Sequence, residues 1–145
     1  MPVGRQFCNE AFTYPAPVAN LLEAKFSARQ VKAVIEHFQG MVSEFQMGHR
    51  ETAITKSGKF VEASLKALWA HLGNTLLKPK EFKVGSIIRQ LEQVPSALAE
   101  DSVRVTIPRA CRFVYEIFSN RGAEHATEQV NPNQMDAAVV VANCS

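Results

Sequence analysis

The sequence predicts an all-α protein, an up-and-down bundle of four or five helices. Apolar residues recur every three or four positions through most of the 145 residues, which is the spacing of a helix face rather than of a strand. Prolines and polar residues interrupt this pattern, so the connections between helices are expected to be short. With 46% hydrophobic and 21% charged residues, the composition is typical of a globular protein, and we expect one domain over residues 1–145.

The N-terminal half is expected to hold an irregular arm and two long helices. Residues 1–20 contain three prolines and are interpreted as the arm, and a short helix within VANLLEAKF is expected to follow. The sequence SARQ at residues 27–30 has a hydroxyl three residues before a glutamine, the arrangement of a helix start. An apolar stripe then continues to a stop near Gly48, and a second stripe covers residues 60–72.

Two shorter helices are expected next. VGSIIRQLEQV predicts a helix that Pro95 ends, and residues 95–106 are interpreted as a loop. Thr106 is then expected to cap a helix that has Pro108 in its first turn, where the missing amide proton costs nothing. The residues expected on its buried face are Ala110, Phe113, Val114 and Ile117.

A last helix is expected after NPNQ at residues 131–134, which again places a cap, a proline and a glutamine at a helix start. The residues expected on its buried face are Met135, Ala138, Val139 and Ala142. The pattern is still apolar at Ser145, so we expect the helix to continue in a longer chain.

Charge and cysteine content exclude several classes of function. A net charge of +2 provides no concentrated basic face for binding duplex DNA. Cys8, Cys111 and Cys144 are an odd number without metal-like spacing, as expected of reduced thiols, so we predict a cytoplasmic protein. No segment is long and apolar enough for a membrane span, and the first residues lack the pattern of a signal peptide. No cofactor or metal motif is present, and we expect neither a cofactor nor a metal.

The densest polar stretch, FSNRGAEHATEQVNPNQMDAA, covers residues 118–138 and lies between two apolar runs. Arg121 and His125 are four residues apart within it, so they share a face if the helix continues and flank one turn if it does not. An arginine can hold a phosphate through two hydrogen bonds, and a histidine titrates near neutral pH. The pair therefore suits chemistry at a phosphodiester, although solvated loop residues are the more common interpretation of any one of these side chains.

The segment IPRACRFVYEIFSNRGAEHATEQVNPNQMDAAVVVANCS, with the earlier GKFVEASLKALWAHL, resembles the HEPN superfamily, small all-helical domains of prokaryotic toxin and phage-defence systems and of some larger ribonucleases. The resemblance covers the C-terminal third well. It implies a bundle that forms a homodimer and joins two copies of an arginine-spacer-histidine motif in one site. Active members cleave RNA without a metal: the ribose 2′-hydroxyl attacks the adjacent phosphorus, the histidine moves protons and the arginine stabilises the phosphorane.

This chain departs from the family pattern at one position. The family spacer is typically four to six residues, and a six-residue spacer before His125 puts the motif arginine at position 118, where Phe118 stands, followed by Ser119. Arg121 leaves only three residues before His125, and Arg112 lies too far back to replace the arginine.

Two hypotheses follow. In the first, the chain is a ribonuclease with His125 as general acid and base, Arg121 as the phosphate ligand, and Asn120 and Glu124 orienting the site or the substrate; its partners are RNA and an antitoxin or another defence protein. In the second, Phe118 marks an inactivated site, and the domain serves as a non-catalytic scaffold that dimerises or binds a partner or a nucleotide. Under the second hypothesis Phe118 is an apolar anchor for an interface.

Overall fold

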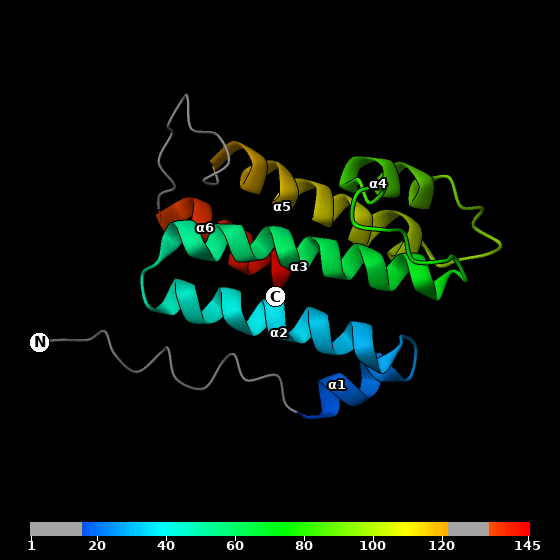
Figure 1. Ribbon diagram of the computed structural model, residues 1–145, viewed down its shortest axis with the longest axis horizontal. Coiled ribbons are helices and arrows are strands. Elements are labelled where there is room, and N and C mark those ends of the chain that lie inside the picture. Colours follow the sequence, from blue (N-terminus) through cyan, green and yellow to red (C-terminus); the bar gives the residue numbers. More distant parts are fainter. Residues whose placement is uncertain (1–15, 122–133) are drawn as a thin grey trace, which may run out of the picture.

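The computed structural model describes residues 16–121 and 134–145, over which the chain is helical and contains no strand (Figure 1). The α-helices are α1 (Ala16–Glu23), α2 (Ala28–Gln46), α3 (Arg50–His71), α4 (Val84–Glu92), α5 (Ile107–Arg121) and α6 (Gln134–Cys144). A π-helical turn, Ser102–Thr106, leads directly into α5. The all-α prediction is confirmed. The irregular arm was expected to reach residue 20, but the helix α1 begins at Ala16, and the rest of the arm lies outside the described residues.

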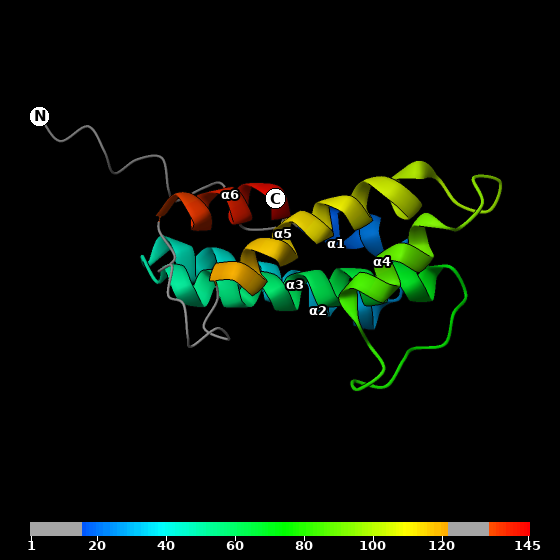
Figure 2. The same ribbon diagram turned by 90° about the horizontal axis from the view of Figure 1, so that it is seen from above.

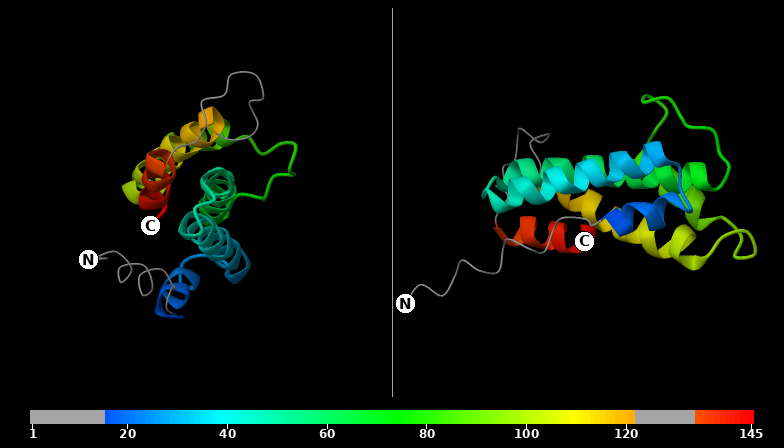
Figure 3. Two further views of the ribbon diagram at one scale, coloured as in Figure 1. Left: turned by 90° about the vertical axis from the view of Figure 1, so that its left-hand side faces the viewer. Right: turned by 90° about the horizontal axis from the view of Figure 1, so that it is seen from below.

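Helix α3 is the centre of the bundle. It runs antiparallel to α2 over most of its length, and α4, α5 and α6 also pack against it (Figure 1). Helices α5 and α6 lie on the same side of α3 (Figure 2). Helix α1 packs on α2 at the edge of the bundle away from α5 (Figure 3). The C-terminal end of α5 and the N-terminal end of α6 therefore lie at one end of the bundle, beside the α2–α3 connection.

The ends of the long helices follow the sequence signals. Ser27 has an extended backbone at the N-cap of α2, and its Oγ accepts a hydrogen bond from the Gln30 amide. Gly48 and Gly73 follow α2 and α3 with φ of 79° and 80°, a left-handed conformation that glycine adopts at no steric cost. Ser27 and Gly48 thus begin and end α2 as the sequence predicts, and Gly73 ends α3 in the same conformation as Gly48.

The core lies where the two long helices meet α4, α5 and α6. Its largest fully buried side chains come from α2, α3 and α4: Met41, Ile54, Leu65, Ile87, Ile88 and Leu91. Each such side chain contributes roughly 1.5–3 kcal/mol by leaving water. The buried face of α2 and the apolar side of α4 are those expected from the sequence.

The expected loop over residues 95–106 is confirmed only for residues 95–100, and the expected cap at Thr106 is wrong. Helical structure already begins near Asp101, and Thr106 is inside the π-helical turn. The Ile107 amide donates to the carbonyl of Ser102, five residues earlier. Pro108 cannot donate a backbone hydrogen bond, and its ring would crowd the preceding turn of a regular helix, so the wider π turn accommodates it inside a continuous helix.

The expected buried faces of the last two helices are also shifted. On α5, Phe113 is 45% exposed and Ala110 is exposed, while Cys111 and Val114 are buried. On α6, Met135 is 74% exposed and Ala142 is exposed, while the buried residues are Ala137, Val140, Val141 and Cys144. Helix α6 is apolar nearly all round, so its sequence did not indicate which side faces the core.

The thiols of Cys111 on α5 and Cys144 on α6 are free and buried, as expected from their apolar neighbours. Burial raises the pKa of Cys111 from 9.0 to about 12. Burial, and secondarily the nearby Cys111, raises the pKa of Cys144 from 9.0 to about 12. Neither thiol is therefore a thiolate nucleophile at neutral pH. Across the described ranges, no helix is long and apolar enough to cross a membrane.

These buried thiols predict a loss of stability at alkaline pH. Above pH 9 a thiol ionises in the unfolded chain but stays protonated in the folded chain, so the unfolded state binds fewer protons and the free energy of unfolding falls as pH rises. The expected slope is up to about 1.4 kcal/mol per pH unit for each thiol. Urea unfolding at several pH values above 8 measures it. Cys144→Ala should show a smaller fall than the parent; an equal fall in both would contradict the prediction.

Candidate functional site

The described part of the predicted site is the last turn of α5. The helix continues through Arg121, and Asn120 is exposed in its last turn while Ser119 is half-buried. Glu124 and His125 lie outside the described residues, as does the side chain of Arg121. The structure therefore places one edge of the predicted site, the end of α5, at the end of the bundle where α6 begins (Figure 1).

Phe118, which stands where the motif arginine is expected, packs against the middle of α3. Its ring lies over Gly58: a Cβ added at Gly58 would be 2.9 Å from the Phe118 Cγ and Cδ2 atoms. Tyr115, one turn earlier on α5, is in ring contact with Phe118 at a centroid distance of 5.3 Å. Any side chain at position 58 would overlap the ring, so α5 approaches α3 here only because residue 58 is a glycine.

The interpretation of Phe118 therefore changes. As an interface anchor, Phe118 would present its ring outside the chain, whereas its ring is half-buried against Gly58 within the chain. The large exposed aromatic side chain of α5 is instead Phe113, which the sequence pattern had placed in the core. The periodicity of the sequence could not reveal this, because both positions are apolar.

The other arginines of α5 are held by an acid on α4. Arg109 Nε lies 3.1 Å from Glu92 Oε1, and Arg112 Nη2 lies 3.5 Å from Glu92 Oε2. Glu92 is the last residue of α4, so these ion pairs connect α4 to the first half of α5. Arg112 is thus engaged away from the helix end and does not replace the motif arginine, in agreement with the sequence analysis.

The described histidines take part in local contacts. His49 Nδ1 lies 2.8 Å from Glu44 Oε2 at the α2–α3 connection. His37 lies half-buried in a groove between α2 and α3. Among residues 16–121 and 134–145, no group of three histidine, cysteine or acidic side chains has the arrangement of a metal site.

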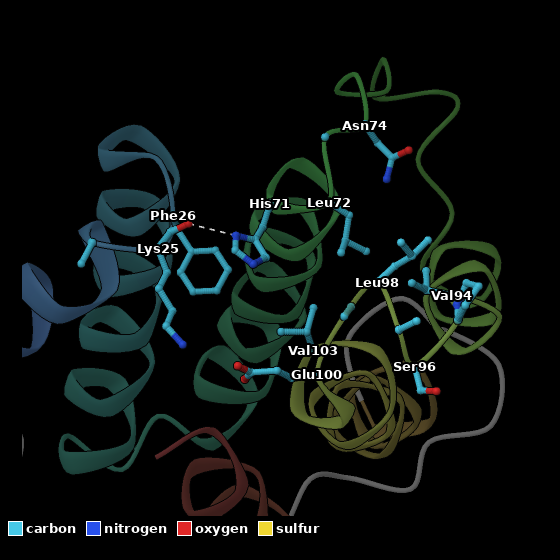
Figure 4. A pocket seen from close by; sticks show the side chains of 15 residues that line it. Lys25, Phe26, His71, Leu72, Asn74, Val94, Ser96, Leu98, Glu100 and Val103 are labelled. Carbon is cyan, nitrogen blue, oxygen red and sulfur yellow. Dashed lines mark hydrogen bonds between the residues drawn. The ribbon is translucent and has the colours of Figure 1, made fainter.

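A separate open cleft of about 1100 Å³ lies at the opposite end of the bundle, between the α1–α2 connection, the end of α3 and residues 94–103. His71 projects at its edge beside Phe26, at a ring-centroid distance of 4.9 Å, and its Nδ1 lies 2.9 Å from the Lys25 carbonyl oxygen (Figure 4). A carbonyl can only accept, so Nδ1 carries the proton.

His71 thus braces α3 against the start of α2. Lys25 and Glu100, which carry opposite charges, are the charged side chains that line this cleft (Figure 4). Within the described structure, no nucleophilic side chain is hydrogen-bonded to His71. The arrangement fits a structural role for His71 and provides no acid, base and nucleophile in contact with one another.

Comparison with protein-family models, with curated proteins and with solved structures gave no match to this chain. The proposed function therefore rests on the residues of this chain.

The contact between Phe118 and Gly58 predicts that Gly58→Ala destabilises the protein. The new methyl group would overlap the base of the Phe118 ring, which cannot swing away without moving α5, and such overpacking typically costs about 1–3 kcal/mol. The higher helix propensity of alanine offsets up to about 1 kcal/mol of this cost. Chemical denaturation of the parent and the variant measures the difference.

Gly85→Ala is the matched control, because a Cβ at Gly85 on α4 would meet nothing within 4 Å. It should leave the protein as stable as the parent or up to about 1 kcal/mol more stable. In a Phe118→Leu background, the penalty of Gly58→Ala should shrink, since the ring is gone. Equal effects of the two glycine substitutions would show that the ring contact does not limit the packing of α5 on α3.

Proposed function

We propose that this chain is a HEPN-like ribonuclease domain that cleaves RNA without a metal ion, in a bacterial defence or toxin–antitoxin system. The observation that carries the proposal is the continuation of α5 through Arg121. Positions 118 and 121 are one turn apart on the same side of the helix, about 4.5 Å along its axis. With Phe118 packed on Gly58, position 121 is the next place on that side from which an arginine can serve the segment that contains His125.

The proposed chemistry uses only side chains of this segment. The His125 imidazole removes the proton from a ribose 2′-hydroxyl, and the 2′-oxygen forms a bond to the adjacent phosphorus. The bond from phosphorus to the 5′-oxygen then breaks, and an imidazolium donates the proton that the leaving oxygen needs. Arg121 stabilises the extra negative charge on the phosphoryl oxygens, and Asn120 and Glu124 orient the site or the substrate.

The proposal includes a homodimer, because one copy of the segment supplies a single histidine and a single arginine. Helices α5 and α6 each expose a large apolar side chain, Phe113 at 45% and Met135 at 74%. Exposed apolar side chains of this size are suited to the core of an interface. Light scattering at micromolar concentration tests this part; a monomer would contradict it.

A non-catalytic scaffold is the second candidate, and the packing of Phe118 favours it. The ring fills the space over Gly58, so an arginine at position 118 would have to lay its aliphatic chain over the glycine and extend its charged end past α3. A phenylalanine in place of the motif arginine would then stabilise the packing of α5 on α3, rather than being a substitution at the surface. Under this proposal the domain binds a partner protein or a second copy, and His125 has no catalytic role.

The two candidates differ in an RNA-cleavage assay with the purified protein in excess chelator. The ribonuclease proposal expects cleavage by the parent, loss of at least about 100-fold in His125→Ala, and a comparable loss in Arg121→Ala, since general acid–base catalysis contributes roughly 100- to 10,000-fold. Phe118→Arg, which restores the expected motif, should cleave faster than the parent.

His71→Ala is the matched control, since His71 lies at the opposite end of α3 from the α5–α6 loop (Figure 1). It should cleave at the rate of the parent. A parent that does not cleave RNA, alone or as Phe118→Arg, would sink the ribonuclease proposal and leave the scaffold. Cleavage that survives in His125→Ala would also contradict the mechanism.

A further inference from the structure

A groove of about 410 Å³ lies between α2, α3 and the start of the α3–α4 connection. Three cationic side chains, Arg29 on α2 and Lys59 and Lys66 on α3, line it together with the half-buried His37. Leu76 and Leu77 of the α3–α4 connection form an apolar border. The sequence analysis did not find this groove, because its cations come from two helices.

These cations are free to bind an anion. Within residues 16–121 and 134–145, Arg29, Lys59 and Lys66 have no ion-pair partner, and the Lys66 ammonium lies 4.9 Å from the centroid of the Phe82 ring. Positive charges left unpaired along one groove raise the local concentration of anions. The groove is therefore an electrostatic site rather than a set of structural ion pairs.

The positive charge extends as a row along the seam between the two helices. Lys56 continues it toward the start of α3: its side chain lies over Gly40 of α2, where an added Cβ would be 3.4 Å from Lys56 Nζ. Positions 56, 59 and 66 face one side of α3 and span roughly 15 Å along its axis.

The acids near this row do not cancel it. Glu62 lines the groove, and Glu36 lies beside it in an ion pair with Lys32 at 3.8 Å. The pKa of His37 is lowered, first by burial and then by Lys59 and Lys56, while Glu36 and Glu62 act in the opposite direction. The fields of the lysines thus reach the imidazole, which is neutral at pH 7.

We propose that this groove binds the phosphodiester backbone of a single-stranded RNA, with Arg29, Lys56, Lys59 and Lys66 contacting successive phosphates. The choice of RNA rests on the proposed ribonuclease function; the row of unpaired cations is independent of it. None of the side chains that line the groove is a phenylalanine, tyrosine or tryptophan, so the main contacts are to phosphates rather than to stacked bases. Binding is therefore independent of base sequence and sensitive to salt.

The test is fluorescence anisotropy with a labelled single-stranded 2′-O-methyl RNA, which cannot be cleaved because its 2′-oxygens are blocked. Lys59→Gln with Lys66→Gln should weaken binding at least tenfold. It should also reduce the slope of log affinity against log salt by about 1.4, since each phosphate contact on a single strand contributes about 0.7. Lys83→Gln with Arg89→Gln, on and beside α4, removes the same charge from exposed positions outside the groove and should change the affinity less than twofold.

NMR titration of the histidines provides a second readout. A bound phosphate would favour the charged imidazole, so the pKa of His37 should rise on addition of the RNA. Equal weakening by the two double substitutions, or an unmoved His37, would overturn the proposal. Displacement of the RNA by an equal concentration of a free mononucleotide would overturn it as well, because one phosphate cannot occupy the row.

The outcome is separable from that of the cleavage assay. Groove-dependent binding by a protein that cleaves no RNA would remove the ribonuclease proposal and retain the groove. Suppose instead that cleavage depends on His125 and that Lys59→Gln with Lys66→Gln does not weaken binding. That outcome would remove the groove proposal and retain the ribonuclease proposal.

Discussion

The close contact between α5 and α3 at Gly58 is the constraint on which the packing of α5 in the bundle depends. Helix α3 is surrounded by four other α-helices, and the side that faces α5 has to be small where the Phe118 ring crosses it. Ser57, next to this point, is fully buried, and its hydroxyl donates to the Ile54 carbonyl, so it packs without an unsatisfied polar group. The sequence Ser57–Gly58 is thus explained by helix packing.

Sequence periodicity predicted the helices whose two faces differ in polarity. Helix α2 alternates between charged residues and a stripe that contains Phe38 and Met41, and both are buried. Sequence periodicity did not predict the buried face of α6 or the start of α5, for different physical reasons. The run AAVVVA has no polar side to point away from the core, and Pro108 was taken as a helix start although a π turn allows it inside a longer helix.

For the candidate site, the sequence predicts a polar segment that resembles a known motif, but it does not predict what Phe118 contacts. Local spacing shows which residues share a helix face, and it cannot show which residue of another helix lies opposite. The partner of Phe118 is Gly58, sixty positions earlier in the chain. The basic groove was missed for the same reason, because Arg29 and Lys66 are brought together only when α2 and α3 pair. A net charge of +2 excludes a large basic face, but it does not exclude a row of a few cationic side chains.

The basic groove and the surface on which α5 packs both include residues of α3. Lys56 and Lys59 flank Gly58 in sequence, so the positive row on the α2 side of α3 and the Phe118 contact on its α5 side lie at the same level of the helix. A helix with its side chains is about 10–12 Å across. A strand held along the row therefore passes within about one helix diameter of the last turns of α5. An anchoring groove at this distance from α5 would position an RNA by its backbone, with no need for base-specific contacts.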